Sequence, residues 1–171
     1  MMGRQSGNVR SIAINSSKYK SLMKEIKTMQ ESGKYSSIAA TMQGGYVAIE
    51  KGTFQHKAEE IEAAKILSRK GFKVILKDET GHIKTPDGYI NKISFEQRTP
   101  KVGTEKGVNK NLEHAKKKGA EIAVIYDKYY IYHKIDIDNG IKLYEKLNKY
   151  RFKTIYVIAQ NEKVYKHSHT K

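Results

Sequence analysis

Two acids and one base stand out in residues 84–100, KTPDGYINKISFEQRTP, because their types and spacing suit a divalent metal ion. Residues 91–98 alternate as a strand does, so Glu96 and Arg98, two positions apart, share one face. Asp87 lies nine positions before Glu96, and a tight bend between them would bring it alongside on the neighbouring strand. Carboxylates ligate hard cations, and a nearby guanidinium can stabilise charge on a phosphate.

A fourth group comes from the helix that the sequence predicts over residues 56–71. Glu60, Ala64 and Leu67 lie on one face of this helix by their spacing. Since Ala64 and Leu67 would pack on a sheet, Glu60 is the acid that leans toward Asp87 and Glu96. We therefore expect these three carboxylates to bind Mg²⁺ or Mn²⁺. Their structural alternatives are a turn aspartate, a cross-strand ion pair and a first-turn helix acid.

The net charge of the 171-residue chain is +15, which favours a polyanionic partner, nucleic acid first. Residues 1–57 carry 9 basic and 3 acidic side chains, residues 101–171 carry 16 and 8, and residues 58–100 carry 8 and 7. The candidate acids thus lie in a nearly neutral middle between two basic flanks. A module that only binds phosphates has no electrostatic reason to place carboxylates there, whereas an enzyme that holds a metal ion does.

The pattern of elements predicts an α/β (α+β) fold with a mixed β-sheet flanked by helices. Helices are expected over residues 16–33, 56–71, 106–118 and 136–150, and strands over 44–52, 72–81, 82–90, 91–100, 120–127 and 152–160. The order from the second helix on is αβββαβ. The chain has no cysteine, which excludes disulfides and thiolate chemistry. With no apolar stretch near residue 1, we expect no signal peptide, no membrane span and a cytoplasmic site of action.

Basic and aromatic side chains outside the acidic group are candidates for contact with nucleic acid. Tyrosines and bases interleave in residues 126–134, YDKYYIYHK, which suits either base stacking or a half-buried strand edge. The histidines show no metal-binding spacing; we interpret His114 as solvated and His167 and His169 as part of a frayed tail. Candidate phosphate ligands are Lys84, Lys110, Lys116, Lys117 and Lys118.

The motifs E-x3-A-x2-L-x3-G-F-K-V, K-T-P-D-G-x-I and F-E-x-R-T-P, within residues 45–130, resemble the PD-(D/E)XK nuclease core. More narrowly, they resemble the C-terminal nuclease domains of contact-dependent growth inhibition toxins and related phage-head-associated domains. The resemblance implies a restriction-endonuclease-like core and a catalytic set of Glu60, Asp87, Glu96 and Arg98. It also implies hydrolysis of RNA, tRNA in particular, and an immunity protein as partner. Residues 1–43 would then be a basic extension with one amphipathic helix, and 44–171 a nuclease-like domain.

Arg98 departs from the resembled family, which has lysine at this position. Arginine keeps its proton and presents a planar fork, so it can bind phosphate but is a poor proton acceptor. Two alternatives therefore stay open: a nucleic-acid-binding protein without catalysis, or a metal-independent RNase that uses His56 or His82 as base. The composition does not distinguish RNA from DNA.

Overall fold

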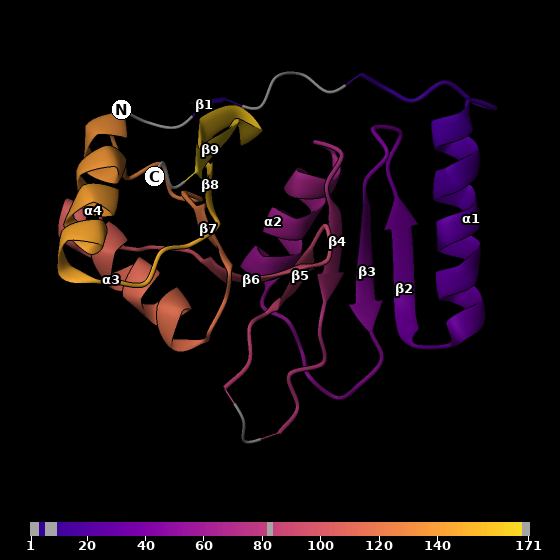
Figure 1. The fold of residues 1–171 in the computed structure, drawn as a ribbon, viewed down its shortest axis with the longest axis horizontal. Helices are drawn as coiled ribbons and strands as arrows, with labels where there is room; N and C mark the ends of the chain where they lie inside the picture. Colours follow the sequence, from indigo (N-terminus) through magenta and orange to yellow (C-terminus); the bar gives the residue numbers. More distant parts are fainter. Residues whose placement is uncertain (1–3, 6–9, 82–83, 169–171) are drawn as a thin grey trace. The chain divides into compact units, whose positions relative to one another are not determined.

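The computed structural model describes residues 4–5, 10–81 and 84–168 of the chain (Figure 1). The fold is α+β, with mixed sheets and four α-helices among these residues. The chain divides into two compact units. The first unit comprises residues 7–83 and 87–92, and the second unit comprises residues 1–6, 84–86 and 93–171. No helix in the described part of the chain has the length and apolar character needed to cross a membrane.

The first unit is a four-stranded sheet with one helix on each face. Its strands, in spatial order, are β2 (Tyr35–Ala40), β3 (Tyr46–Glu50), β4 (Lys73–Leu76) and β5 (Gly88–Ile90). Strands β3 and β4 are parallel, and the other neighbouring pairs are antiparallel. Helix α1 (Ser17–Ser32) precedes β2, and helix α2 (Ala58–Ser68) connects the two parallel strands. The sheet is therefore mixed, as expected.

Alternation along β3 directs the two helices to opposite faces. Tyr46 and Ala48 form a buried core with Leu22 and Ile26 of α1. Val47, between them, points the other way, where α2 packs against β3 and β4. The buried residues of α2 include Ala64 and Leu67, as the helical spacing predicts. Helix α2 thus lies over the sheet and carries Glu60 in its first turn.

The second unit is a sheet whose strands run in the spatial order β6, β7, β8, β9, β1. Strands β6, β7 and β8 are parallel, while β9 is antiparallel to β8 and β1 is antiparallel to β9. Helix α3 connects β6 to β7, and α4 connects β7 to β8. The bounds are β1 Arg4–Gln5, β6 Ile93–Arg98, α3 Glu105–Lys117, β7 Ile122–Tyr126, α4 Lys134–Leu147, β8 Thr154–Ile158 and β9 Val164–Ser168.

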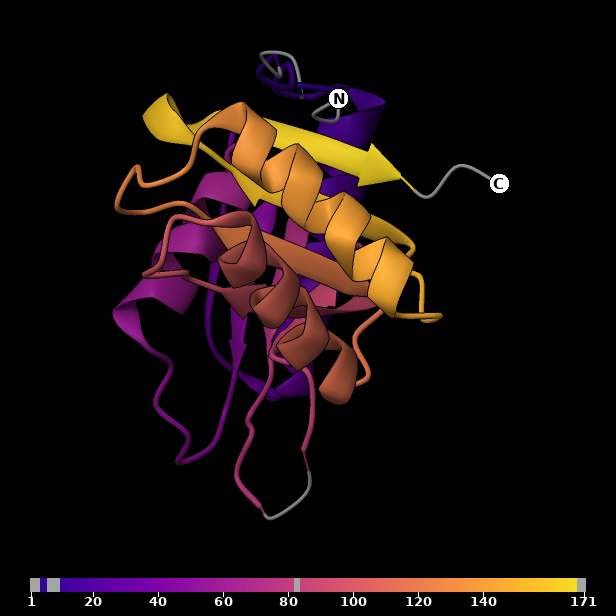
Figure 2. The ribbon, with the colours of Figure 1, turned by 90° about the vertical axis from the view of Figure 1, so that its left-hand side faces the viewer.

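Helices α3 and α4 lie side by side on one face of the second sheet (Figure 2). Their apolar stripes meet alternate residues of the strands in a single core. Its fully buried members include Val108 and Leu112 of α3, Tyr144 of α4, and Val157 of β8. Burying four side chains of this size stabilises the unit by about 1.5–3 kcal/mol each before the entropy cost of ordering them. Because this core holds α3 on one face of the sheet, side chains on that face of β6 lie next to α3.

The structure corrects four sequence-based expectations. Residues 164–168 form strand β9, and not a trailing end, so His167 lies in a strand. Residues 35–40, for which no element was expected, form β2. Among the described residues of the strand expected over 82–90, Gly88–Ile90 form strand β5. Residues 127–133, between β7 and α4, form a loop and not a strand edge. His82 and His169 lie outside the described residues. The predicted domain boundary between 43 and 44 stays a prediction.

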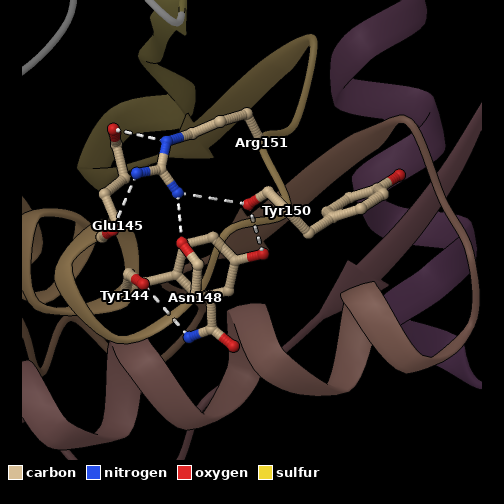
Figure 3. Close-up of polar contacts among 5 residues, drawn as sticks. All are labelled: Tyr144, Glu145, Asn148, Tyr150 and Arg151. Atoms are coloured by element: carbon tan, nitrogen blue, oxygen red, sulfur yellow. Dashed lines mark hydrogen bonds and ion pairs between the residues drawn. The ribbon is translucent and has the colours of Figure 1, made fainter.

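Arg151 closes the C-terminal end of α4 (Figure 3). Its guanidinium donates to the backbone carbonyls of Glu145 (2.7 Å) and Asn148, and its Nε lies 3.3 Å from the Glu145 carboxylate. The Tyr144 hydroxyl donates to the Tyr150 carbonyl at 2.9 Å. A cation at this end satisfies carbonyls that the helix leaves without partners and interacts favourably with the helix dipole.

Arg151→Ala is accordingly expected to lower the free energy of unfolding by about 1–2 kcal/mol, because it removes charged hydrogen bonds to the last carbonyls. Urea denaturation measures this as a lower midpoint with an unchanged slope. Lys149→Ala is the matched control, since this neighbouring lysine is exposed and its change should stay within about 0.5 kcal/mol. Equal midpoints for the two variants would contradict the capping role of Arg151.

Candidate active site

Acidic side chains gather at the edge of the first unit where β3 and β4 end. Glu50 is the last residue of β3, and Asp78 and Glu79 follow β4. The backbone N–H of Asp78 donates to Glu50 Oε2 at 3.2 Å, and the Asp78 carboxylate accepts from Thr80 and from the N–H of Phe54. The hydrogen bond from Thr80 is the largest influence on the Asp78 carboxyl and lowers its pKa. This acid therefore stays charged.

The first turn of α2 reaches the same edge and brings an imidazole to the acids. His56 Nδ1 lies 3.1 Å from Glu60 Oε2, and the His56 side chain is only 3% exposed. The Phe54 ring packs against this imidazole in a T-shaped arrangement, with the centroids 4.9 Å apart. Ligand atoms of His56, Glu60 and Glu79 all lie within 4.8 Å of one another. Two carboxylates and one imidazole form a donor set that fits Mg²⁺ less well than Mn²⁺, which accepts nitrogen more readily.

Asp87 also belongs to this edge of the first unit. Its backbone carbonyl accepts from the N–H of Lys77 at 2.9 Å, just past the paired residues of β4 and β5. The residue is 3% exposed and immediately precedes β5. Asp87 and Glu60 thus both lie at this edge of the first unit, and their joint binding of a metal ion stays a prediction. Glu79 is the member of this group that the sequence analysis missed, because it lies in the turn-like segment KDETG and has no periodic signal.

Glu96 and Arg98 lie in the second unit, on β6, and share a face as expected. They pair in register with Ala123 and Ile125 of β7, whose side chains belong to the core under α3 and α4. Both therefore face the helices, while Phe95 faces the other way. Glu96 is 3% exposed. Since Asp87 and Glu60 belong to the first unit, the metal set of these two with Glu96 stays a prediction.

Two consecutive hydrogen bonds connect Arg98 to the backbone of α3. Its Nε donates to Asn111 Oδ1 at 3.2 Å, and Asn111 Nδ2 donates to the Gly107 carbonyl at 2.7 Å. The hydrogen bond from Asn111 to Gly107 fixes the orientation of the Asn111 amide. The amide oxygen in turn fixes the position of the Arg98 guanidinium. No hydrogen bond from the two terminal guanidinium nitrogens to any described residue is found. Those N–H groups are the ones that form two parallel bonds to a phosphate.

Further cations surround His114 of α3, one turn after Asn111. Burial lowers the pKa of His114 most, and the positive charges of Arg98, Lys118, Lys117 and Lys84 lower it further. The half-buried Lys118 also donates to the Thr85 carbonyl at 3.3 Å. The four cations near His114 indicate a surface of positive potential, which attracts anions. His114 was interpreted from sequence as solvated; it is instead partly buried at the centre of this group.

The lysines predicted to bind nucleic acid do not all point the same way. By helical spacing Lys110 and Lys117 lie on the His114 side of α3. Lys116 lies on the α4 side, where its Nζ donates to Asn148 Oδ1 at 2.9 Å. Lys84, Lys110 and Lys117 are exposed or partly exposed. Lys116 thus contacts the C-terminal end of α4, whereas Lys118 contacts the Thr85 carbonyl.

This division gives a test of the basic surface. Lys117→Gln with Lys118→Gln should weaken RNA binding for every sequence and reduce the salt slope of log K by about 0.7 for each phosphate that is no longer neutralised. Lys116→Gln, which removes one charge at the adjacent position, should leave the slope unchanged. Fluorescence anisotropy between low and moderate salt measures both. Equal slopes in all three proteins would make the lysines at 117 and 118 a solvated helix face only.

His167 of β9 contacts a carboxylate in the second unit. Its Nε2 lies 3.4 Å from Asp138 Oδ1 of α4. Burial is the largest influence on the pKa of His167 and lowers it, while the Asp138 carboxylate raises it. This pair joins the last strand to α4, so we assign His167 a structural role.

No family model matches the chain, and no curated protein matches it either. A solved structure does: a chain of the CdiA-CT/CdiI toxin and immunity complex from Burkholderia pseudomallei. The match has a TM-score of 0.53 and 17% sequence identity, and it covers 74% of this chain and the whole of the matched chain. At this identity the likeness establishes a shared fold.

Proposed function

We propose that the protein is a toxin-type nuclease that hydrolyses phosphodiester bonds in RNA, with tRNA as a candidate substrate, and uses a divalent metal ion. The observation that carries this proposal is the group of His56, Glu60 and Glu79 at one edge of a chain whose net charge is +15. Two carboxylates and an imidazole can bind a metal ion, and the surrounding positive charge can attract a polyanionic substrate. A metal-assisted reaction on a polyanion needs both. The fold shared with a chain of a toxin and immunity complex supports the toxin type.

Each predicted residue has a distinct task in this proposal. Glu60, Asp87 and Glu96 would hold Mg²⁺ or Mn²⁺, with His56 and Glu79 adjoining Glu60. When bound, such an ion supplies an activated water and offsets charge on the phosphate. Arg98, fixed by Asn111, binds the scissile phosphate through its terminal N–H groups. It stabilises the charge that develops there, and it does not accept a proton.

A second candidate function rests on one contact. The hydrogen bond between His56 and Glu60 could orient the imidazole as a general base, as carboxylates do in catalytic triads. The protein would then be an RNase that needs no metal ion. The His56 side chain is almost fully buried, however, which places its ring out of direct contact with solvent. This burial favours the metal-dependent reaction.

Incubation with total RNA and with plasmid DNA, each with Mg²⁺, Mn²⁺ or EDTA, tests the proposal. Cleavage of RNA only when metal is present is the expected result. Cleavage in EDTA would instead support the RNase that uses His56. Binding without cleavage under every condition would identify a nucleic-acid-binding protein on this fold, and preferential cleavage of plasmid would replace RNA by DNA as the substrate.

An immunity protein is the partner that goes with this proposal. The similar structure is, by its title, a complex of a toxin with its immunity protein. The net charge of +15 would favour an acidic protein as the counterpart for this chain. Loss of cleavage on addition of such a protein, at a one-to-one ratio, is the corresponding measurement.

A further inference from the structure

The loop between β7 and α4, residues 127–133, presents two aromatic rings to solvent. Tyr129 is 48% exposed and Tyr130 is 59% exposed. Two adjacent exposed aromatic rings present apolar surface that a ligand can cover. Lys128 and Lys134 stand on either side of them in the sequence, and Lys128 Nζ lies 6.0 Å from the centre of the Tyr129 ring. The loop therefore combines aromatic faces with positive charge.

A buried carboxylate holds this loop in one conformation. Asp127 is 3% exposed, and its two oxygens accept from the N–H groups of Ile131 (3.0 Å) and Tyr132 (3.3 Å). Tyr130, which lies between Asp127 and Ile131 in the sequence, adopts a φ of +54°, in the left-handed region that bulky residues seldom occupy. The Tyr132 hydroxyl also donates to the carbonyl of Val102, in the loop after β6, at 2.9 Å. The rings are thus displayed by an ordered loop, which reduces the entropy cost when a ligand binds.

The loop lies at the edge of the second unit where the parallel strands end. Strand β6 ends at Arg98 and β7 at Tyr126, so the loops that follow them leave the same edge (Figure 2). A cavity of about 220 Å³ opens beside the loop, with Tyr132, Lys134 and Lys163 among its lining residues. Two lysines at the cavity and one near Tyr129 provide cations around the exposed rings.

We propose that Tyr129 and Tyr130 form a stacking site for the bases of unpaired nucleotides, with Lys134 and Lys163 contacting the adjoining phosphates. Every base has a π-face, so stacking requires unpaired bases but no particular sequence. Duplex bases are already stacked on one another and cannot use these rings. The inference rests on the proposed nuclease function and deepens it, because it assigns single-stranded or looped RNA as the substrate class. Exposed Val102 and Ile135 nearby have no π-face and take no part in stacking.

The test measures binding in EDTA, where metal-dependent cleavage is suppressed. The ligands are a fluorescent single-stranded RNA 12-mer of mixed sequence and the same strand in a duplex, and the readout is anisotropy. Tyr129→Ala and Tyr130→Ala should each weaken single-strand binding about ten-fold, the scale for removing one stacked base, and leave duplex binding unchanged. Tyr→Phe at either position should retain affinity, since the ring remains, whereas Tyr→Leu should behave as alanine does.

Ile135→Ala is the matched control, an exposed apolar side chain in the first turn of α4, and should bind as the wild type does. Full affinity in the leucine variants, or equal losses in the control, would overturn stacking in favour of a hydrophobic contact. Unchanged affinity in the alanine variants would show that Tyr129 and Tyr130 do not bind nucleotides, and contact with a protein partner would be the remaining explanation for their exposure. Cleavage that persists in that case would separate failure of this inference from failure of the nuclease proposal. Binding that depends on Tyr129 and Tyr130, without cleavage by the wild-type protein, would support the stacking site and contradict the nuclease proposal.

Discussion

Glu60→Gln is expected to reduce metal-dependent cleavage by about 10³-fold, because one of the proposed ligands loses its charge and the ion is held more weakly. A bound metal ion supplies several kcal/mol of transition-state stabilisation, which corresponds to that factor in rate. The substitution keeps the size of the side chain, so α2 should stay folded. Asp87→Asn is expected to act in the same direction, since Asp87 lies at the same edge of the first unit. Single-turnover cleavage measures the rates, and titration calorimetry with Mn²⁺ measures ion binding.

Glu59→Gln provides the control for this prediction. Glu59 precedes Glu60 in the first turn of α2 and carries the same charge, but it is not part of the group with His56 and Glu79. Its substitution should leave both the cleavage rate and Mn²⁺ binding near wild type. If Glu60→Gln and Asp87→Asn cleave at the wild-type rate while His56→Ala is inactive, the metal mechanism is wrong and the imidazole mechanism takes its place.

Arg98→Ala is expected to lower the cleavage rate by about 10²–10³-fold without weakening Mn²⁺ binding, the scale for removing one donor that acts on the transition state. Arg98→Lys should recover part of this rate, because it restores the charge but not the two parallel hydrogen bonds. Asn111→Ala removes the partner of Arg98 Nε and should produce a smaller decrease in the same rate constant. Measuring kcat and KM separately shows whether the decrease is in the chemical step.

The outcome that would contradict this role is a change in affinity alone. If Arg98→Ala raises KM and leaves kcat unchanged, Arg98 binds the substrate and its transition state equally well. If the wild-type protein cleaves nothing with any metal ion, Arg98 marks a site without catalysis. The basic residues around His114 would then serve binding only.

The helices were predictable from the sequence because their signals are local. Ser16 caps α1 through its side chain, Gly33 ends it with a φ of +69°, and Thr104 caps α3. Strand β2 was missed because YSSIAA has neither strict alternation nor β-branched residues in number, and its antiparallel pairing with β3 determines its state. Strand β9 was missed for the same reason: it depends on pairing with β8, which lies earlier in the chain.

The candidate site was predictable only where periodicity places a residue. The shared face of Glu96 and Arg98 follows from strand alternation, and it is observed. The contact of Glu60 with His56 follows from the i to i+4 spacing at the start of α2, although its closeness to Glu79 does not. The role of Asn111 depends on the packing of α3 on β6, and the exposure of Tyr130 depends on a positive φ in a loop. Neither has a sequence signature.

The pairing of β1 with β9 has a consequence for how the chain folds. Arg4 lies opposite Lys166, so the second unit brings together residues that are separated by nearly the full length of the sequence. The chain also passes from one unit to the other four times, at 6–7, 83–84, 86–87 and 92–93. Contacts of such high sequence separation slow folding, because loop closure must precede the gain from pairing. Neither unit corresponds to one continuous fragment, and the pairing of the N-terminal strand requires the last strand of the chain as its partner.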